Sequence, residues 1–290
     1  MLILLADAFK ADLPKRLEAY GEVTQDQGRV ADAEIIIVRS KTKVDKAMMD
    51  KAPKLKFIIR GGVGVDTIDV EYAKSKNVAV DNTPEASSLA VAELAFALMI
   101  SLPNHIAEAD ASMKQGKWLK KELERTELAG KTLGLVGIGR IAREVAVRAK
   151  AFGMRVIAYD KFVEKSDAAE MMSLEQVLAQ SDYISLHTPL TDETKGMINA
   201  KALASMKKGA YLVNTCRGKV VFEEDIVAAL ESGQLAGYGT DVYYSDPPEN
   251  TPLAKAPHVV MTPHLGASTA ENLDRLGDCI VERVRKYCKK

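Results

Sequence analysis

The stretch 240–250, TDVYYSDPPEN, places Asp241, Asp246 and Glu249 close together with no basic residue beside them. A carboxylate in such a position is a candidate for proton transfer. Asp, Asn and Pro also build turns in proteins of every kind, because they favour loop conformations. The stretch alone therefore leaves two alternatives open, a catalytic acid and an ordinary turn.

A second group of residues could bind a dinucleotide. Gly137 and Gly139 lie in LGLVGIGRIAREVA (133–146), where an apolar strand passes into a helix. A close turn there lets backbone N–H groups at the start of the helix face a pyrophosphate. Ala142 takes the place of the third glycine of the fingerprint and still permits close packing of helix on strand. By itself this motif is weak, since many tight strand–helix turns contain two glycines.

Asp160 strengthens the dinucleotide interpretation. It ends the next predicted strand, where a carboxylate can accept hydrogen bonds from ribose hydroxyls and repel a 2′-phosphate. The pattern therefore predicts NAD as the cofactor. Lys161, the next residue, is the feature that keeps NADP open as an alternative.

The composition is that of a soluble globular protein with two domains of ordinary size. The chain has 290 residues, of which 47% are hydrophobic, and the 40 Lys and Arg balance the 40 Asp and Glu. This balance argues against nucleic acid or an anionic membrane as the main partner. The three cysteines show no CxxC or metal-ligand spacing, which fits a reduced, cytoplasmic setting and predicts no metal.

Neither of the two most apolar segments fits a signal peptide or a membrane span. The N-terminus, MLILLADAFKADLP, meets charged residues after a few apolar ones and predicts a first buried strand. The run 89–102 contains Glu93 and is shorter than a bilayer span.

Apolar runs alternate with amphipathic stretches, which is the pattern of parallel sheets with helices on both faces. We therefore expect an α/β fold with two doubly wound parallel-sheet domains, Rossmann- or flavodoxin-like, and a cleft between them. The predicted strands are 2–8, 34–40, 55–61, 78–82, 132–137, 155–160, 183–188, 211–215, 236–242 and 258–264. The predicted helices are 14–21, 44–52, 70–77, 87–118 as one long region, 139–152, 173–180 with a Ser173–Gln176 capping box, 199–207 and 223–232.

Ordered motifs over nearly the whole chain resemble the D-2-hydroxyacid dehydrogenases, and within that family the D-3-phosphoglycerate dehydrogenases. In the second half these motifs are GIGRIAREVA (137–146), SLHTPLTDETKGMIN (185–199), LVNTCRGKVVFEEDIVAAL (212–230), GTDVYYSDPP (239–248) and TPHLGAST (262–269). In the first half they are RSKTKV (39–44), RGGVGVDTID (60–69), DNTPEASSLAVAEL (81–94) and ASMKQGKW (111–118).

The resemblance implies a division of the chain and a partner. Residues 1–98 and 268–290 are expected to form a substrate-binding domain, and residues 99–267 an NAD-binding Rossmann domain, with the active site in the cleft. The helical region 99–125 is expected to form a homodimer. Because the chain stops at Lys290, we also expect no C-terminal regulatory domain and no inhibition by serine through one.

By the same resemblance, His264 in PHLGAST is the catalytic histidine and Arg217 in TCRG orients the substrate, with a fork that suits a carboxylate and a carbonyl oxygen. Asp246 lies where the family normally has a glutamate that hydrogen-bonds the histidine ring, with Glu249 as the fallback. Aspartate is one methylene shorter. Either the loop moves inward, or the contact between the acid and the histidine ring becomes longer and passes through a water molecule. We expect Asp246 still to pair with His264, but to favour the protonated ring less than a glutamate would.

The remaining site residues are also implied by the resemblance. Asp241 is expected to face the nicotinamide carboxamide, and His187 to line the cofactor pocket, whereas His105 and His258 are expected to be surface or packed histidines. The residues predicted to bind the cofactor are Gly137, Gly139, Arg140, Ile141, Asp160, His187, Thr188, Pro189, Thr215, Cys216, Asp241 and Gly266.

Basic residues at strand ends and the loop GGVGV (61–65) predict a site for carboxylate and phosphate groups, and the resemblance implies that the small anionic substrate is a phosphorylated 2-hydroxy or 2-keto acid. Lys41 and Lys43 add positive charge near it, and a contribution from Lys120 and Lys121 of a neighbouring subunit stays open. The residues predicted to bind the substrate are Arg39, Ser40, Arg60, Gly61, Gly62, Val63, Gly64 and Asn82.

The leading expectation is NAD-dependent oxidation of D-3-phosphoglycerate to 3-phosphohydroxypyruvate in serine biosynthesis. The first alternative is a reductase of hydroxypyruvate, glyoxylate or another 2-keto acid, which should not need a phosphate site. The second, from another class, is an NAD(H)-sensing binding protein, which would bind NADH with negligible turnover. The set of Arg217, Asp246 and His264 favours an enzyme.

Overall fold

The computed structural model describes residues 1–289, and the chain divides into two compact units. The first unit is Met1–Ser88 together with the segment that starts at Ala267, and the second unit is Leu89–Gly266. The division after Ser88 and the predicted boundary after residue 98 both lie inside helix α4 (Pro84–Ser101). Lys290, the last residue of the predicted segment 268–290, lies outside the described residues.

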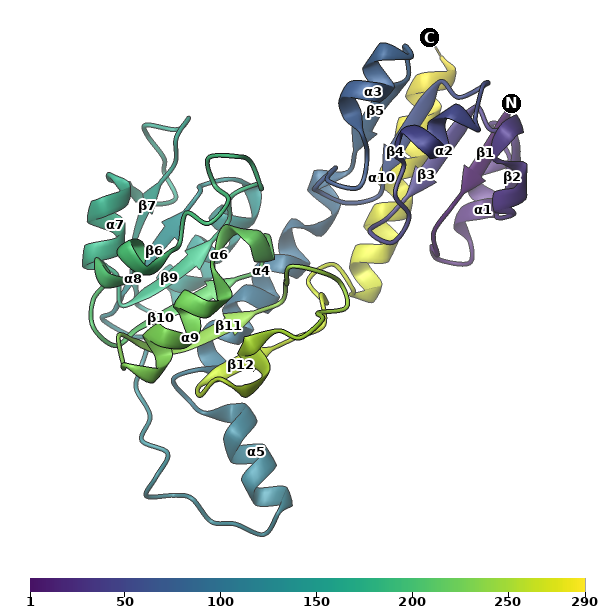
Figure 1. Cartoon of the computed structure of the whole chain (residues 1–290). Helices are drawn as coiled ribbons and strands as arrows, with labels where there is room; N and C mark the ends of the chain where they lie inside the picture. The colour runs from purple at the N-terminus through teal and green to yellow at the C-terminus, as the bar shows by residue number, and fades with distance from the viewer. Residues whose placement is uncertain (290) are drawn as a thin grey trace. The chain divides into compact units, whose positions relative to one another are not determined.

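The first unit is built on a five-stranded parallel sheet of order β2-β1-β3-β4-β5, a flavodoxin-like order. Alternate residues of its strands point to opposite faces, so Ile36 and Ile58 belong to one buried cluster and Ile35 and Ile59 to another. Helices cover both faces (Figure 1). The strands are β1 (Leu2–Leu5), β2 (Glu22–Thr24), β3 (Ile35–Val38), β4 (Phe57–Arg60) and β5 (Ala79–Asn82). The helices are α1 (Leu13–Leu17), η1 (Gln27–Asp32), α2 (Lys46–Asp50), α3 (Val70–Ser75) and α10 (Ala270–Cys288).

The second unit contains a seven-stranded parallel sheet of order β12-β11-β10-β9-β6-β7-β8. The order reverses between β6 and β9, and in such sheets ligands bind outside the carboxyl ends of the strands at this point. The strands are β6 (Thr132–Val136), β7 (Arg155–Tyr159), β8 (Glu170–Met171), β9 (Tyr183–Leu186), β10 (Ala210–Asn214), β11 (Leu235–Thr240) and β12 (Val259–Met261). The helices are α4, α5 (Ile106–Lys114), α6 (Arg140–Ala151), α7 (Leu174–Gln180), α8 (Ala200–Ala204), η2 (Gly218–Val220), α9 (Glu223–Glu231) and η3 (Pro252–Lys255).

The predicted fold class, α/β with two doubly wound parallel sheets, is confirmed. The capping box of α7 is also present, with the Ser173 side chain accepting from the Gln176 amide and the Gln176 side chain from the Ser173 amide. Strands β2 and β8 were missed. They have 3 and 2 residues and lie at the edges of their sheets, where there is too little apolar sequence to mark a strand.

The prediction of one helical region over 87–118 is wrong. The chain forms α4 and then α5 as separate helices, and residues 115–118 lie outside both. Pro103 removes a backbone donor after α4, and His105 adopts a left-handed backbone with φ 51°, so a continuous helix cannot pass through.

Helix α4 is long and apolar enough to cross a membrane if only length and composition are considered. The helix is longer than the apolar run 89–102 because it begins at Pro84. However, 56% of it is buried inside the protein. Ala92, Ala95 and Met99 are fully buried in the core of the second unit, which is the environment of a core helix.

Candidate active site

The turn between β6 and α6 uses two glycines for different reasons. Gly137 has φ +95°, and a Cβ atom there would lie 2.7 Å from the carbonyl oxygen of His187, so only glycine fits. Gly139 has an ordinary φ of −68°, and a Cβ atom there would meet nothing within 4 Å. The fold requires Gly137, whereas Gly139 keeps the space at the N-terminus of α6 open, where a pyrophosphate would bind.

Asp160 holds this turn from the end of the neighbouring strand β7. One of its carboxylate oxygens accepts from the Ile138 amide (2.9 Å), and the other from the Phe162 amide (2.9 Å). Lys161, the residue that kept NADP open, forms an ion pair with Glu193 (2.6 Å). Its positive charge is therefore partly offset.

The carboxyl ends of β9 and β10 supply a test of whether a dinucleotide fits. The hydroxyl groups of Thr188 and Thr215 follow these strands and are buried without a hydrogen-bond partner among residues 1–289. A buried hydroxyl left unpaired is costly. Together with the open space at Gly139, these two groups fit a polar ligand at the position where doubly wound sheets bind dinucleotides.

Two titratable side chains near these strand ends are unsuited to acid–base chemistry at neutral pH. Burial lowers the pKa of His187 to about 4, so the ring is neutral; its Nε2 atom lies 2.9 Å from the Ser185 hydroxyl. Burial also raises the pKa of the Cys216 thiol. These values fit residues that line a pocket, which is the role predicted for both.

Asn214 shapes the turn that carries Arg217. It is the fully buried last residue of β10, and its side-chain oxygen accepts from the Cys216 amide (3.1 Å) while its Nδ2 donates to the Arg217 carbonyl (3.0 Å). The Arg217 guanidinium in turn donates to the Cys216 carbonyl (2.6 Å). The sequence analysis missed Asn214, although its place at the end of an apolar strand was a usable signal.

Gly218 brings this turn against the chain that leads to Asp246. A Cβ atom at Gly218 would lie 2.1 Å from the carbonyl carbon of Tyr243, so no other residue allows this approach. Tyr243 then donates its hydroxyl to the Thr262 carbonyl (2.8 Å). Burial, followed by the charges of Asp241 and Asp246, raises the pKa of Tyr243 to about 12, so the hydroxyl remains a donor.

Asp241 anchors the loop that carries His264. Asp241 is only 1% exposed. Its carboxylate accepts from the Thr262 hydroxyl (2.6 Å), the Leu265 amide (2.7 Å) and the Gly266 amide (2.8 Å). The Gly266 amide is therefore engaged within the protein. Contacts of Asp241 and Gly266 with a cofactor stay predictions.

The loop 262–266 presents His264 to Asp246. The Nδ1 atom of His264 and an Asp246 carboxylate oxygen form a direct hydrogen bond, so the shorter acid reaches the ring without an intervening atom. The partner is thus Asp246 rather than Glu249. With Nδ1 engaged by the carboxylate, Nε2 is left for a substrate, and the His264 side chain is 42% exposed.

The predicted anion-binding residues lie in the first unit, and a carboxylate lies among them. Asp7 accepts from the Arg39 amide (2.6 Å) and from the Thr42 hydroxyl (2.6 Å). Asp7 was missed by the sequence analysis. It fixes the loop after β3, and it also lowers the positive potential near Arg39 and the exposed Ser40.

The Gly61 and Gly62 amides, which belong to the predicted anion-binding loop, are engaged within the protein, so their contact with a substrate stays a prediction. Gly61 donates to the Val38 carbonyl (2.7 Å) and Gly62 to the Thr83 hydroxyl (2.8 Å), so both amides serve the fold. Val63 and Gly64 are the other predicted residues of this loop. Asn82 donates to the Val63 carbonyl, and Arg60 donates to the Gly61 carbonyl.

The roles of the other predicted residues stay predictions. Arg140 and Ile141 form the first turn of α6, and the Pro189 carbonyl accepts from the Thr194 hydroxyl (2.6 Å). Lys120 and Lys121 are exposed between α5 and β6.

We expect Gly139→Ala to weaken NADH binding at least tenfold without changing the melting temperature. The new methyl group meets no protein atom, but it occupies the space at the start of α6. NADH fluorescence titration and thermal unfolding check this. Gly137→Ala is the comparison and should lower the melting temperature as well. Equal NADH affinity in Gly139→Ala and the unaltered protein would show that the dinucleotide lies elsewhere.

Comparison with known proteins gives one family. The family model described as D-isomer specific 2-hydroxyacid dehydrogenase, NAD binding domain, matches residues 96–266. A D-3-phosphoglycerate dehydrogenase of Methanocaldococcus jannaschii is 42% identical over 301 residues, which cover 99% of this chain. The chain spans only 57% of the length of that relative.

Two further proteins resemble the chain over most of their own length. A hydroxypyruvate reductase of Thermotoga maritima is 45% identical over 261 residues, covering 89% of this chain and 85% of that protein. The crystal structure of a D-lactate dehydrogenase of Aquifex aeolicus, complexed with NAD and lactic acid, superposes with a TM-score of 0.88 at 31% identity. That superposition covers 100% of this chain and 96% of the other.

Proposed function

Since this chain belongs to the D-isomer specific 2-hydroxyacid dehydrogenase family, we propose that it interconverts a D-2-hydroxy acid and its 2-keto acid with a nicotinamide dinucleotide. The observation that carries the proposal is the hydrogen bond between Asp246 and His264. It gives the second unit an oriented acid–base group in addition to a dinucleotide turn.

In this proposal each side chain has one task. Arg217 holds the substrate carboxylate and polarises the oxygen on C2 through its bidentate fork. His264 removes the hydroxyl proton during oxidation and returns it during reduction, through Nε2. Asp246 fixes the orientation and the tautomer of the ring. A bound nicotinamide supplies the acceptor for the hydride that leaves C2.

We propose NAD rather than NADP as the cofactor. Asp160 offers a carboxylate at the end of β7, where it would repel a 2′-phosphate. Lys161, the next residue and a cation that could attract such a phosphate, is engaged by Glu193. Relatives with bound NADPH are known in this fold, so the comparison of the two cofactors is informative.

The substrate we propose is D-3-phosphoglycerate, oxidised to 3-phosphohydroxypyruvate in serine biosynthesis. Support comes from the similarity to a D-3-phosphoglycerate dehydrogenase and from the basic residues Arg39, Lys41 and Arg60 of the first unit. Hydroxypyruvate is the second candidate, because the reductase of that name is equally similar and is matched over more of its length.

The free cysteines support a cytoplasmic location.

The test is steady-state NADH consumption with 3-phosphohydroxypyruvate, hydroxypyruvate and glyoxylate. We expect kcat/KM for the phosphorylated substrate to exceed the others by about 100-fold, the scale of a charge-assisted contact of roughly 3 kcal/mol. Arg39→Gln should reduce that preference, and Arg29→Gln, a cation paired with Glu22 in the same unit, should not. Equal use of the small keto acids would move the chain to the general reductases, and NADH binding without turnover would favour a sensor.

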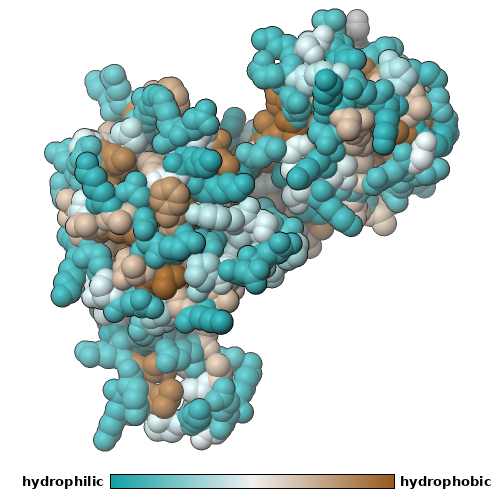
Figure 2. All heavy atoms as spheres, in the orientation of Figure 1, coloured by the Kyte–Doolittle hydropathy of each residue, from teal (hydrophilic) through white to brown (hydrophobic). Residues whose placement is uncertain are grey.

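We also propose that the chain forms a homodimer through the segment 99–125. Ile106 and Met113 are each 55% exposed and Trp118 is 72% exposed, which is unusual for apolar side chains on one short segment. Figure 2 shows apolar atoms on the part of the second unit where Figure 1 places α5. Light scattering should give the mass of two chains, and a single-chain mass at micromolar concentration would contradict this.

A further inference from the structure

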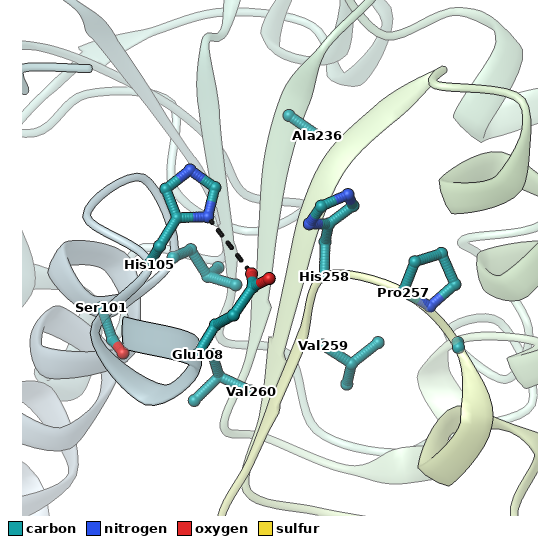
Figure 3. Close-up of a pocket in the computed structure, with 10 residues that line it drawn as sticks. Ser101, His105, Glu108, Ala236, Pro257, His258, Val259 and Val260 are labelled. Atoms are coloured by element: carbon teal, nitrogen blue, oxygen red, sulfur yellow. Dashed lines mark ion pairs between the residues drawn. The ribbon is translucent and has the colours of Figure 1, made fainter. Parts of the chain in front are cut away.

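His105 and His258 come from distant parts of the sequence and meet in the second unit. Their ring centroids lie 6.3 Å apart at an interplanar angle of 70°. Glu108 joins them, with a carboxylate oxygen 3.8 Å from Nδ1 of His105. Figure 3 shows the three side chains converging on one pocket, and one ligand atom from each lies within 4.8 Å of the others.

The backbone explains how the three groups converge. His105 is the N-cap of α5 and Glu108 lies three residues further, so their side chains share one face of the helix. His258 comes directly before β12. Both histidines adopt left-handed backbone, with φ 51° and 54°, a conformation that costs about 1–2 kcal/mol for most residues with a side chain. Two such residues that aim their rings at one pocket indicate a shared purpose.

The hydrogen bond of the His105 ring sets its tautomer. Nε2 lies 2.9 Å from the Glu124 carbonyl oxygen, which can only accept, so the ring proton lies on Nε2. Nδ1 therefore carries the lone pair and faces Glu108. Histidines that bind metals commonly donate their other N–H to a backbone carbonyl in this way, which fixes the ring and increases its basicity.

The surroundings suit a small ion. The pocket has a volume of about 320 Å³, and Leu102, Ala236, Val259 and Val260 contribute apolar parts of its lining. Two neutral imidazoles and one carboxylate would offset one of the two charges of a divalent cation. Three protein ligands also leave one position of a tetrahedron for water.

We propose that His105, Glu108 and His258 bind one divalent transition-metal ion, of which Zn²⁺ is the representative. The donor set decides the class, because imidazole nitrogen suits zinc, nickel, cobalt and copper, whereas calcium and magnesium prefer oxygen. Bond lengths of about 2.0–2.1 Å require ligand atoms about 3.4 Å apart. In the structure the ligand atoms lie up to 4.8 Å apart, and movement of the exposed Glu108 and His258 side chains would bring them to the required distance.

The bound ion would join the start of α5 to the edge strand β12, whose carboxyl end continues into the loop of His264. It would therefore stabilise the edge of the sheet, and it has no part in the proposed reaction. The binding test below needs no turnover, so it stands or falls separately from the proposed function.

The experiment uses full-length protein stripped with a chelator, with Zn²⁺ measured by titration calorimetry and Co²⁺ by its visible absorption. We expect one ion per chain and a rise in melting temperature with Zn²⁺. His105→Asn and His258→Asn should each weaken binding by at least 100-fold, and asparagine is chosen because it tolerates the left-handed backbone. His264→Asn is the control and should bind as the unaltered protein does.

Three results would overturn the proposal. The first is no stoichiometric binding at millimolar Zn²⁺. The second is binding that persists when His105 and His258 are both replaced, or that disappears in His264→Asn, which would assign the ion to the pair of His264 and Asp246. The third is one ion for every two chains, which would indicate a bridge between copies instead of a site within one chain.

Discussion

His264→Asn is expected to lower kcat for keto-acid reduction by about 10³-fold, within the 10²–10⁴ range that general acid–base catalysis contributes. The substitution removes the group that delivers the proton to the carbonyl oxygen, while asparagine keeps the left-handed backbone that the loop requires at φ 54°. NADH affinity should change little, since the dinucleotide turn is formed by other residues. Stopped-flow NADH oxidation and a fluorescence titration measure the two quantities.

His258→Asn, compared with the unaltered protein after both are treated with a chelator so that the proposed ion plays no part, is the matched control, because His258 has the same φ of 54° and precedes the strand that leads to His264. It should retain kcat within a factor of two. The partner acid can be tested in the same assay. If Asp246→Glu leaves the pH–rate profile unmoved while Glu249→Gln shifts it, Asp246 is not the working partner of His264.

Arg217→Gln is expected to lower kcat/KM by about 10³-fold, equal to roughly 4 kcal/mol of transition-state stabilisation. A neutral amide cannot replace the charged, bidentate fork that holds a carboxylate and polarises a carbonyl. Arg217→Lys should recover only part of the loss, because a lysine offers one point of contact. Steady-state kinetics with the preferred keto acid give these values.

Arg155→Gln is the control for the loss of an arginine charge from the second unit, since Arg155 is exposed and paired with Glu170 (2.7 Å). Its kcat/KM should stay unchanged. A tenfold loss or less in Arg217→Gln, with substrate affinity intact, would mean that another group binds the carboxylate.

Much of the fold is encoded locally and could be predicted. Strands β1 and β3 are buried at every residue, so both faces of each strand are apolar and the sequence reads as an uninterrupted apolar run. The glycine turn and the capping box of α7 are also local patterns. The break between α4 and α5 combines Pro103, which is a local signal, with the left-handed backbone of His105, which the helical pattern of the sequence does not reveal.

The types of residue in the site could be predicted, whereas the residues that hold them in position could be predicted much less well. Gly218 and Asp7 act through contacts with segments far along the chain, and one sequence contains no sign of which backbone will approach them. Gly218 is required only because Tyr243 passes 2.1 Å from the position of its absent Cβ. The acceptors of the Gly61 and Gly62 amides, the Val38 carbonyl and the Thr83 hydroxyl, also come from other segments, so the sequence does not show that these amides are engaged.

The most direct single measurement is the reduction of 3-phosphohydroxypyruvate with NADH by the purified protein and by His264→Asn, with the configuration of the product determined. We expect stoichiometric NADH oxidation, a product of D configuration, and a rate about 10³-fold lower in the variant. An L-configured product, or equal rates in the two proteins, would contradict the assignment of His264 and Arg217 as the groups that act on the substrate.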